Sequence, residues 1–153
     1  MAQMLQFLRD CGDPVSTVLC EHARRFDSVT PCPDNLKGRL GQCYGNASKL
    51  ALADANLAYC EGFGFDPSMG VPIRHGWVVD PGGRVIDPTW RDNSDCIYFG
   101  IALRTSFMWR RVVARRQWCA WIDSHDWIGG VSLKELSEML DPRWHSIDHL
   151  VKV

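Results

Sequence analysis

Three segments of the chain carry side chains with complementary reactivity. Cys43 lies in residues 41–47 (GQCYGNA), His75 in residues 74–80 (RHGWVVD) and Asp87 in residues 84–90 (RVIDPTW). A thiol, an imidazole and a carboxylate can act as a nucleophile, a base and the group that orients the base. The segments therefore predict a nucleophilic cysteine site, on the condition that the fold brings them together.

Cys43 is expected at the start of a helix that begins near Gln42. Alanine and leucine dominate the following residues, and Asn56 is a plausible end for the helix. The partial positive charge at a helix N-terminus favours a thiolate over a thiol, and the first backbone N–H groups are free to bind a developing oxyanion. Because most single cysteines are structural, the position of Cys43 indicates a catalytic role only if a histidine and a carboxylate lie beside it.

The turn chemistry bears on whether His75 and Asp87 share a face. A two-residue loop between their strands would place them on opposite faces. A three-residue loop over residues 81–83 pairs Asp80 with Arg84 and makes them diagonal neighbours, and Gly83 supplies the left-handed residue that such a loop needs. The plainer interpretations are a buried core histidine and an Asp-Pro turn that only ends a strand.

The remaining patterns predict an α+β domain. A helix begins at Asp13-Pro14 and extends to about Phe26, and a helix over about 107–122 is followed by one over 133–140, opened by the capping box of residues 132–135. Strands are expected over residues 57–65, 73–79, 84–86 and 96–103. We expect the cysteine helix to pack on an antiparallel β-meander, with additional N- and C-terminal helices.

Size and composition fit one domain over residues 1–153. Its core is expected at about 38–103, followed by a C-terminal helical extension over about 104–153. With 17 basic and 18 acidic residues, the charge argues against a nucleic-acid partner. No apolar stretch approaches the roughly 20 residues of a membrane span, so we expect no membrane partner.

The N-terminus and the cysteines point to a reducing compartment. The first ten residues lack the features of a signal peptide and predict a short helix. The seven cysteines form no Cys-x-x-Cys pair, which argues for reduced thiols and against a zinc site. We therefore expect a cytoplasmic protein, in a bacterial cell or a phage-infected host, that needs no metal or organic cofactor.

The ordered motifs resemble the transglutaminase-like superfamily of papain-like cysteine enzymes. They are the cysteine at a helix start, a strand over residues 57–63, His75-x-Trp77, and Asp87-Pro-Thr on the next strand, spanning about residues 38–101. The resemblance implies Cys43 as nucleophile, His75 as base and acid, and Asp87 as the group that holds the imidazole. The chain is also similar to small uncharacterised bacterial and phage proteins with this pattern.

The sequence departs from the family pattern at several points. Gly76 replaces the usual alanine, Phe63 stands where tyrosine is common, and no arginine begins the first strand. The separation of 75 − 43 = 32 residues is short for the family and leaves out large substrate loops. These departures concern the substrate more than the triad.

Further residues are candidates for the oxyanion site or the substrate groove. These are Gln42, Tyr44, Glu61, Trp77 and Trp90. Three of them have a plainer alternative that the sequence leaves open. Gln42 fits a solvated first-turn position, Trp77 fits a core position, and Glu61 fits an exposed position on a strand.

Two functional hypotheses follow. In the first, the protein is a cysteine enzyme that transfers acyl groups from a protein or peptide substrate. With water as the acceptor it is a peptidase (thiol protease), amidase or deamidase, and with an amine it is a transglutaminase. In the second, the protein is a catalytically silent, phage-encoded binding or inhibitory protein that acts through its C-terminal helices. Their basic and aromatic residues are Trp109, Arg110, Arg111, Arg115, Arg116 and Trp118.

Overall fold

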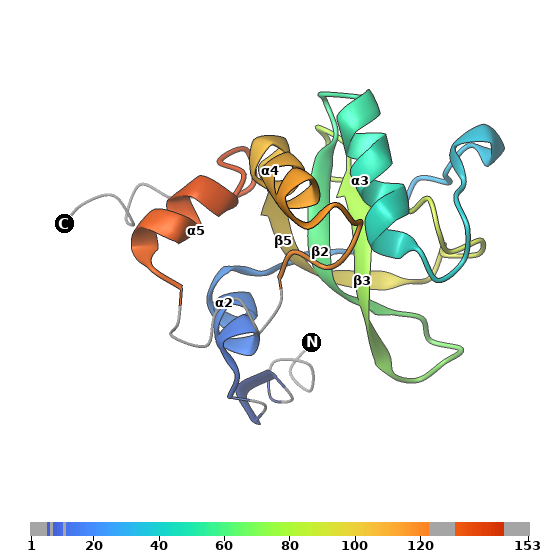
Figure 1. The fold of residues 1–153 in the computed structure, drawn as a ribbon. Helices are drawn as coiled ribbons and strands as arrows, with labels where there is room; N and C mark the ends of the chain where they lie inside the picture. Colours follow the sequence, from blue (N-terminus) through green and yellow to red (C-terminus); the bar gives the residue numbers. More distant parts are fainter. Residues whose placement is uncertain (1–5, 7, 11, 123–130, 146–153) are drawn as a thin grey trace.

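The computed structural model describes residues 6, 8–10, 12–122 and 131–145 (Figure 1). Its elements in chain order are α2 (Pro14–His22), β1 (Arg24–Phe26), the 3₁₀ turn η1 (Asp34–Leu36), α3 (Cys43–Ala53), β2 (Ala58–Phe65), β3 (Pro72–Val79), β4 (Val85–Ile86), β5 (Ile97–Leu103), α4 (Thr105–Arg115) and α5 (Leu133–Met139). Residues 6 and 8–10 are also helical, and the rest of the helix expected at the N-terminus lies outside the described residues.

The strands form one curled antiparallel sheet in the order β1-β5-β2-β3-β4. The four predicted strands are all present, and the mixed α and β architecture is confirmed. The predicted meander is wrong for β5. The chain does not add β5 beside β4 but returns it to the other side of β2, where Phe63 pairs with Phe99. This placement leaves β2 as the central strand.

The β3–β4 hairpin has the predicted three-residue loop. Val78 pairs with Ile86 and Val79 with Val85, so the next pair outward is Asp80 with Arg84. The Asp80 backbone N–H donates to the Arg84 carbonyl at 3.0 Å. Gly83 has a φ of +81°, the left-handed conformation that this loop requires.

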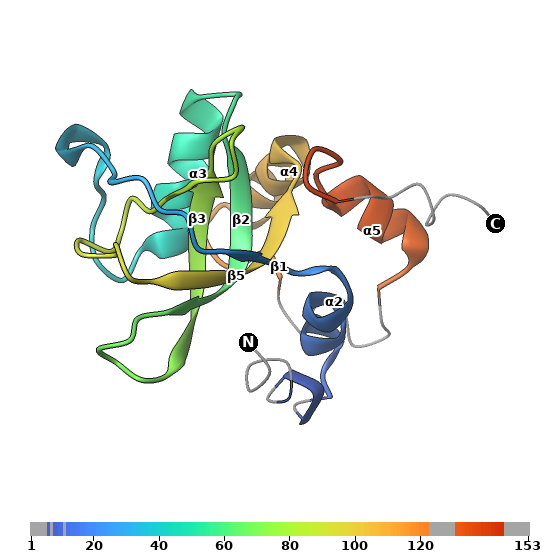
Figure 2. The same ribbon diagram turned by 180° about the vertical axis from the view of Figure 1, so that it is seen from behind.

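The two faces of the sheet are covered differently. All four labelled helices pack on one face, where residues such as Leu19, Ala47, Met108 and Met139 join the inward side chains of the strands. The opposite face carries a second apolar cluster around Trp77, closed by strand edges and loops. Figure 2 shows this face, with the strands in front of α3 and α4.

Two predicted helices end earlier than expected. Asp13 caps α2 as predicted, but the helix ends at His22 because residues 24–26 pair with β5 as β1. The helix α4 ends at Arg115, not near residue 122, and Arg116 adopts a left-handed conformation. The capping box at Ser132 opens α5 as predicted. Within the described part of the chain, no helix is long and apolar enough to span a membrane.

Candidate active site

His75 and Asp87 meet on one face of the sheet. Asp87 follows β4 directly, and the register of the hairpin makes it a diagonal neighbour of His75 on β3. The Nε2 atom of His75 lies 2.7 Å from Oδ2 of Asp87. Both side chains are buried, with 2% and 0% exposure. The carboxylate therefore fixes the orientation of the ring, which leaves Nδ1 as the nitrogen that is not engaged by Asp87.

A network of donors holds the Asp87 carboxylate in place. The backbone N–H groups of Thr89 and Trp90 donate to Oδ1 at 2.8 and 3.2 Å. The Tyr98 hydroxyl donates to Oδ2 at 2.8 Å, and the Asn93 amide donates to the Tyr98 oxygen at 3.1 Å. With His75 at Oδ2 as well, both oxygens of the carboxylate have protein partners that fix its position.

Aromatic rings enclose the imidazole. The Trp90 ring stacks on His75, with centroids 4.2 Å apart and an interplanar angle of 23°. Trp90 occupies space that Gly64 leaves free on β2, because a Cβ at Gly64 would lie 2.5 Å from the Trp90 ring. Trp77 and Tyr98 complete the surroundings, with centroids 6.5 and 6.1 Å from that of His75. Among these rings the His75 side chain keeps only 2% of its surface exposed to solvent.

Cys43 is the first residue of α3, as predicted, and its thiol is free and half-buried. The helix start is anchored beside His75 by its next residue. Tyr44 lies against Gly76, where an added Cβ would be 3.0 Å from Cδ1 and 3.3 Å from Cα of the tyrosine. The glycine that replaces the usual alanine of the resembled family thus gives Tyr44 its close approach to β3.

The pKa of His75 reflects burial of the ring and the two side chains beside it. Burial opposes charging of the ring, but the hydrogen bond with Asp87, followed by a hydrogen bond with the Cys43 side chain and the charges of both groups, raises the pKa from 6.5 to about 9. Near neutral pH the ring is therefore an imidazolium.

Glu61 is not an exposed strand residue, because its side chain is buried on the helix-covered face. Oε1 accepts hydrogen bonds from the Tyr59 hydroxyl and from the backbone N–H of Trp121. Oε2 accepts one from the backbone N–H of Ile122. Burial raises the pKa of Glu61, and these donors partly offset that rise. Glu61 fastens the segment after α4 to the sheet, so its carboxylate is already occupied by protein donors.

The other predicted lining residues divide between the core and the surface. Trp77 is fully buried and fills the core, in line with its plainer interpretation. Gln42 is exposed as a first-turn residue and makes no side-chain hydrogen bond to cap α3. Tyr44 and Trp90 are half-buried beside Cys43 and His75, so of the five they lie best for contact with a substrate.

Several residues of the network are absent from the sequence-based prediction. Tyr98 reaches Asp87 from β5, a strand that the meander would have placed elsewhere. The Asn46 amide donates to the Thr89 hydroxyl at 3.0 Å and so joins α3 to the loop that holds Asp87. The Asp-Pro-Thr motif was the available signal for Thr89, because an Asp side chain often accepts from the N–H two residues later.

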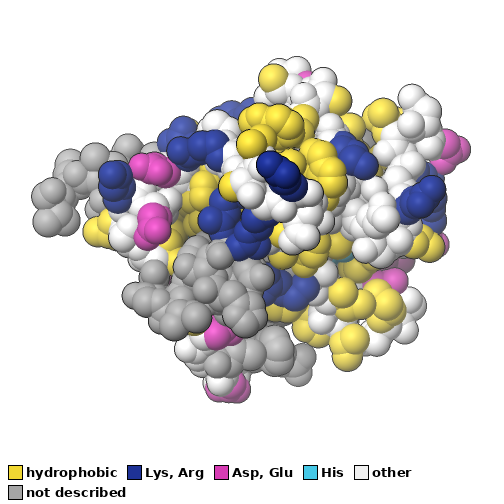
Figure 3. All heavy atoms as spheres, in the orientation of Figure 1, with side chains coloured by type: hydrophobic (Ala, Val, Ile, Leu, Met, Phe, Trp, Pro, Cys, Tyr) yellow, Lys and Arg dark blue, Asp and Glu magenta, His cyan; other side chains and the backbone are white. Residues whose placement is uncertain are grey.

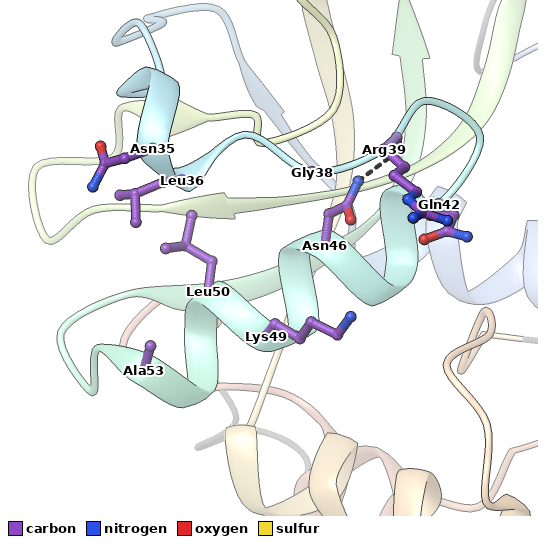
Figure 4. Close-up of a pocket in the computed structure, with 9 residues that line it drawn as sticks. All are labelled: Asn35, Leu36, Gly38, Arg39, Gln42, Asn46, Lys49, Leu50 and Ala53. Atoms are coloured by element: carbon purple, nitrogen blue, oxygen red, sulfur yellow. Dashed lines mark hydrogen bonds between the residues drawn. The ribbon is translucent and has the colours of Figure 1, made fainter.

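A pocket of about 590 Å³ runs along α3, on the side facing the loop that precedes the helix. We call it the α3 pocket. Its lining residues are Asn35, Leu36, Gly38, Arg39, Gln42, Asn46, Lys49, Leu50 and Ala53 (Figure 4). Cys43 is not among them, but Gln42 directly precedes it. The pocket therefore lies along the helix that begins with the candidate nucleophile and is bordered by the residue before it.

Comparison of this chain with family models, with curated proteins and with solved structures gives no match. Within the described ranges, no group of three or more His, Cys, Asp or Glu side chains is arranged to hold a metal ion.

Proposed function

We propose that the protein is a cysteine acyl-transfer enzyme with Cys43, His75 and Asp87 as its catalytic triad, related in fold to the transglutaminase-like enzymes that it resembles. The observation that carries this proposal is the buried His75 ring, with Oδ2 of Asp87 2.7 Å from Nε2 and the Cys43 side chain close enough to help raise the pKa of the ring. A ring clamped in this way by a carboxylate and a thiol is the arrangement that nucleophilic cysteine catalysis requires.

The first half-reaction begins from a Cys43 thiolate and a His75 imidazolium. The sulfur attacks the carbonyl carbon of an amide, forming a C–S bond and a tetrahedral oxyanion. When this intermediate collapses, the C–N bond breaks and His75 gives its proton to the leaving nitrogen. The products are a thioester on Cys43, a neutral His75 and a free amine, or ammonia if the substrate is a side-chain amide.

The second half-reaction releases the acyl group. Neutral His75 takes a proton from water as the water oxygen attacks the thioester carbonyl, and collapse breaks the C–S bond. This step regenerates the thiolate and the imidazolium and gives a carboxylic acid, so the protein is a peptidase, amidase or deamidase. An amine in place of water would give a new amide and a transglutaminase. We favour water, because it needs no second binding site.

The start of α3 supplies stabilisation for the oxyanion. The first bond of the helix runs from the Asn46 N–H to the Gln42 carbonyl at 2.9 Å. The N–H groups of Cys43, Tyr44 and Gly45 have no carbonyl four residues earlier within the helix. We propose that the Cys43 N–H, at the positive end of the helix, donates to the oxyanion, a contribution that is typically about 3 kcal/mol per donor.

Alkylation by iodoacetamide near neutral pH, with mass-spectrometric mapping of each thiol, tests this function. Cys43 should react at least about tenfold faster than the other cysteines, because the proposed thiolate is paired with the His75 imidazolium. Cys60 and Cys96 are internal controls, since burial raises the pKa of Cys60 well above 9 and that of Cys96 to about 11. Replacement of His75 by Asn should remove the excess reactivity. Equal reactivity of Cys43 and Cys119, which is also half-buried, would refute the proposal.

A second candidate function, a protein-binding surface on α4, is favoured by its exposed apolar side chains. Trp109 and Val113, one helical turn apart, are 47% and 56% exposed. Trp118, just after the helix, is 38% exposed, and basic side chains lie among these residues (Figure 3). Binding to a partner protein that survives Cys43→Ala and is lost in Trp109→Ala would favour this function over catalysis.

A further inference from the structure

The α3 pocket has a different chemical character at each end. In Figure 4 the Lys49 side chain points toward the end where Arg39 and Gln42 lie. At the other end, Leu36 and Leu50 point toward one another, close to Ala53. One end therefore offers positive charge and amide groups, and the other offers an apolar wall.

The two cations of the pocket have no carboxylate partner in the described part of the chain. Neither Arg39 nor Lys49 forms an ion pair there, and none of the lining residues is acidic. The Lys49 ammonium lies 5.7 Å from the centroid of the Trp118 ring, an uncharged neighbour. By contrast, the nearby Lys37 is paired with Asp34 at 2.7 Å. Two cations in one hollow, with no carboxylate partner among the described residues, favour an anionic ligand group.

The charged end of the pocket adjoins the candidate catalytic site. Gln42 lines the pocket and is followed directly by Cys43. Asn46 lines the pocket and donates to Thr89, which belongs to the loop that holds Asp87. Asn46 also donates to the Arg39 carbonyl at 2.8 Å, so the backbone that carries the cation is fixed to α3. The charged end of the pocket is therefore linked to both chain segments that carry Cys43 and Asp87.

We propose that the α3 pocket is a substrate subsite that binds a carboxylate at Arg39 and Lys49 and an apolar side chain between Leu36 and Leu50. The substrate would then be a peptide with an acidic group and a neighbouring apolar residue close to the acyl group that Cys43 attacks. The volume of about 590 Å³ lies in the range of small-molecule sites and accommodates about two amino-acid residues. The identification of the ligand as a peptide rests on the proposed function.

Binding of three N-acetylated dipeptides to the Cys43→Ala protein tests the subsite without any turnover. The binding is monitored through changes in the amide chemical shifts in NMR spectra. The probes are acetyl-Glu-Leu-amide, its neutral counterpart acetyl-Gln-Leu-amide, and acetyl-Gln-Leu with a free C-terminal carboxylate. We expect a carboxylate peptide to bind at least about fivefold more tightly than the neutral one. The reason is that a partly exposed contact between a carboxylate and a cation adds a modest stabilisation. The shifts should centre on residues 38–50. The third peptide distinguishes a chain-terminal carboxylate from a side-chain one.

Matched variants decide whether the tighter binding of the carboxylate peptides comes from the α3 pocket. The double variant Arg39→Gln with Lys49→Gln should abolish the preference, and Arg39→Lys with Lys49→Arg should retain it. Lys134→Gln, which removes an exposed lysine on α5, is the control and should leave the preference unchanged. Equal affinity for all three peptides, or a preference that survives the double Gln variant, would overturn the subsite. Either result is independent of Cys43 alkylation, which tests the catalytic proposal by itself.

Discussion

Replacement of Asp87 by Asn changes the charge beside His75 while nearly preserving its shape. The two N–H groups of residues 89 and 90 should keep the amide oxygen in the place of Oδ1, because both donate there in the wild type. The amide nitrogen, a donor, then faces Nε2 of His75. The ring must present Nε2 as an acceptor, so its proton moves to Nδ1, the nitrogen that the thiol needs as a base.

The size of the effect follows from the pKa of His75. A rise from 6.5 to about 9 corresponds to about 3 kcal/mol, at roughly 1.4 kcal/mol for each pH unit. Because the pKa is raised on folding, this stabilisation is fully present below about pH 6.5 and is lost as the pH rises through about 9. In Asp87→Asn, burial dominates, the pKa should fall below 6.5, and this pH dependence of stability should disappear.

Two assays measure this prediction. An NMR titration of the ring carbons gives the pKa of His75 directly, with His145 as an internal reference, since burial lowers its pKa to about 4. Urea unfolding of wild type and Asp87→Asn on both sides of the 6.5 to 9 range gives the change in the free energy of unfolding. Asp27→Asn, at an exposed surface ion pair, is the control and should leave the pH dependence unchanged. A wild-type His75 that titrates near 6.5, unaffected by Asp87→Asn, would refute the reasoning.

Three further variants probe the supports of the site. Tyr98→Phe removes a donor to the Asp87 carboxylate, so the NMR-measured pKa of His75 should rise further; an unchanged pKa would count against this role. Gly76→Ala puts a Cβ 3.0 Å from Tyr44 and should lower the free energy of unfolding by about 1–3 kcal/mol in urea titrations, and an unchanged midpoint would contradict the close packing. Glu61→Gln leaves one backbone donor poorly paired, so the Ile122 amide should exchange with deuterium faster than in the wild type; retained protection would argue against the anchor.

Local chemistry was enough to predict the hairpin that aligns the candidate triad. The glycine at position 83 fixes the loop length, the loop length fixes the register, and the register brings His75 and Asp87 to one face. The start of α3 at Cys43 was equally local, since it depends on helix propensity alone. These features depend on interactions between residues that lie within about a dozen positions of one another in the chain, so they can be predicted from the sequence.

The features that the sequence did not predict depend on contacts between distant segments. Residues 24–26 follow a helical pattern but become a strand because β5 offers a free edge. The helix α4 has no glycine or proline to end it at Arg115, and the N–H groups of the residues that follow are bound instead by Glu61. The role of Tyr98 depends on the return of β5 to β2, which no local motif specifies.

Acetyl transfer from p-nitrophenyl acetate is the most direct measurement of whether the three side chains act as a catalytic unit. Rapid quenching and peptide mapping should find the acetyl group on Cys43 in the wild type, with its release limited by water. His75→Asn should react slowly and retain any acetyl group it acquires, and Cys43→Ala should show no acetylation at this position and no burst of p-nitrophenol. Acetylation spread over several thiols and lysines, at rates that His75→Asn leaves unchanged, would contradict the assignment of a catalytic triad.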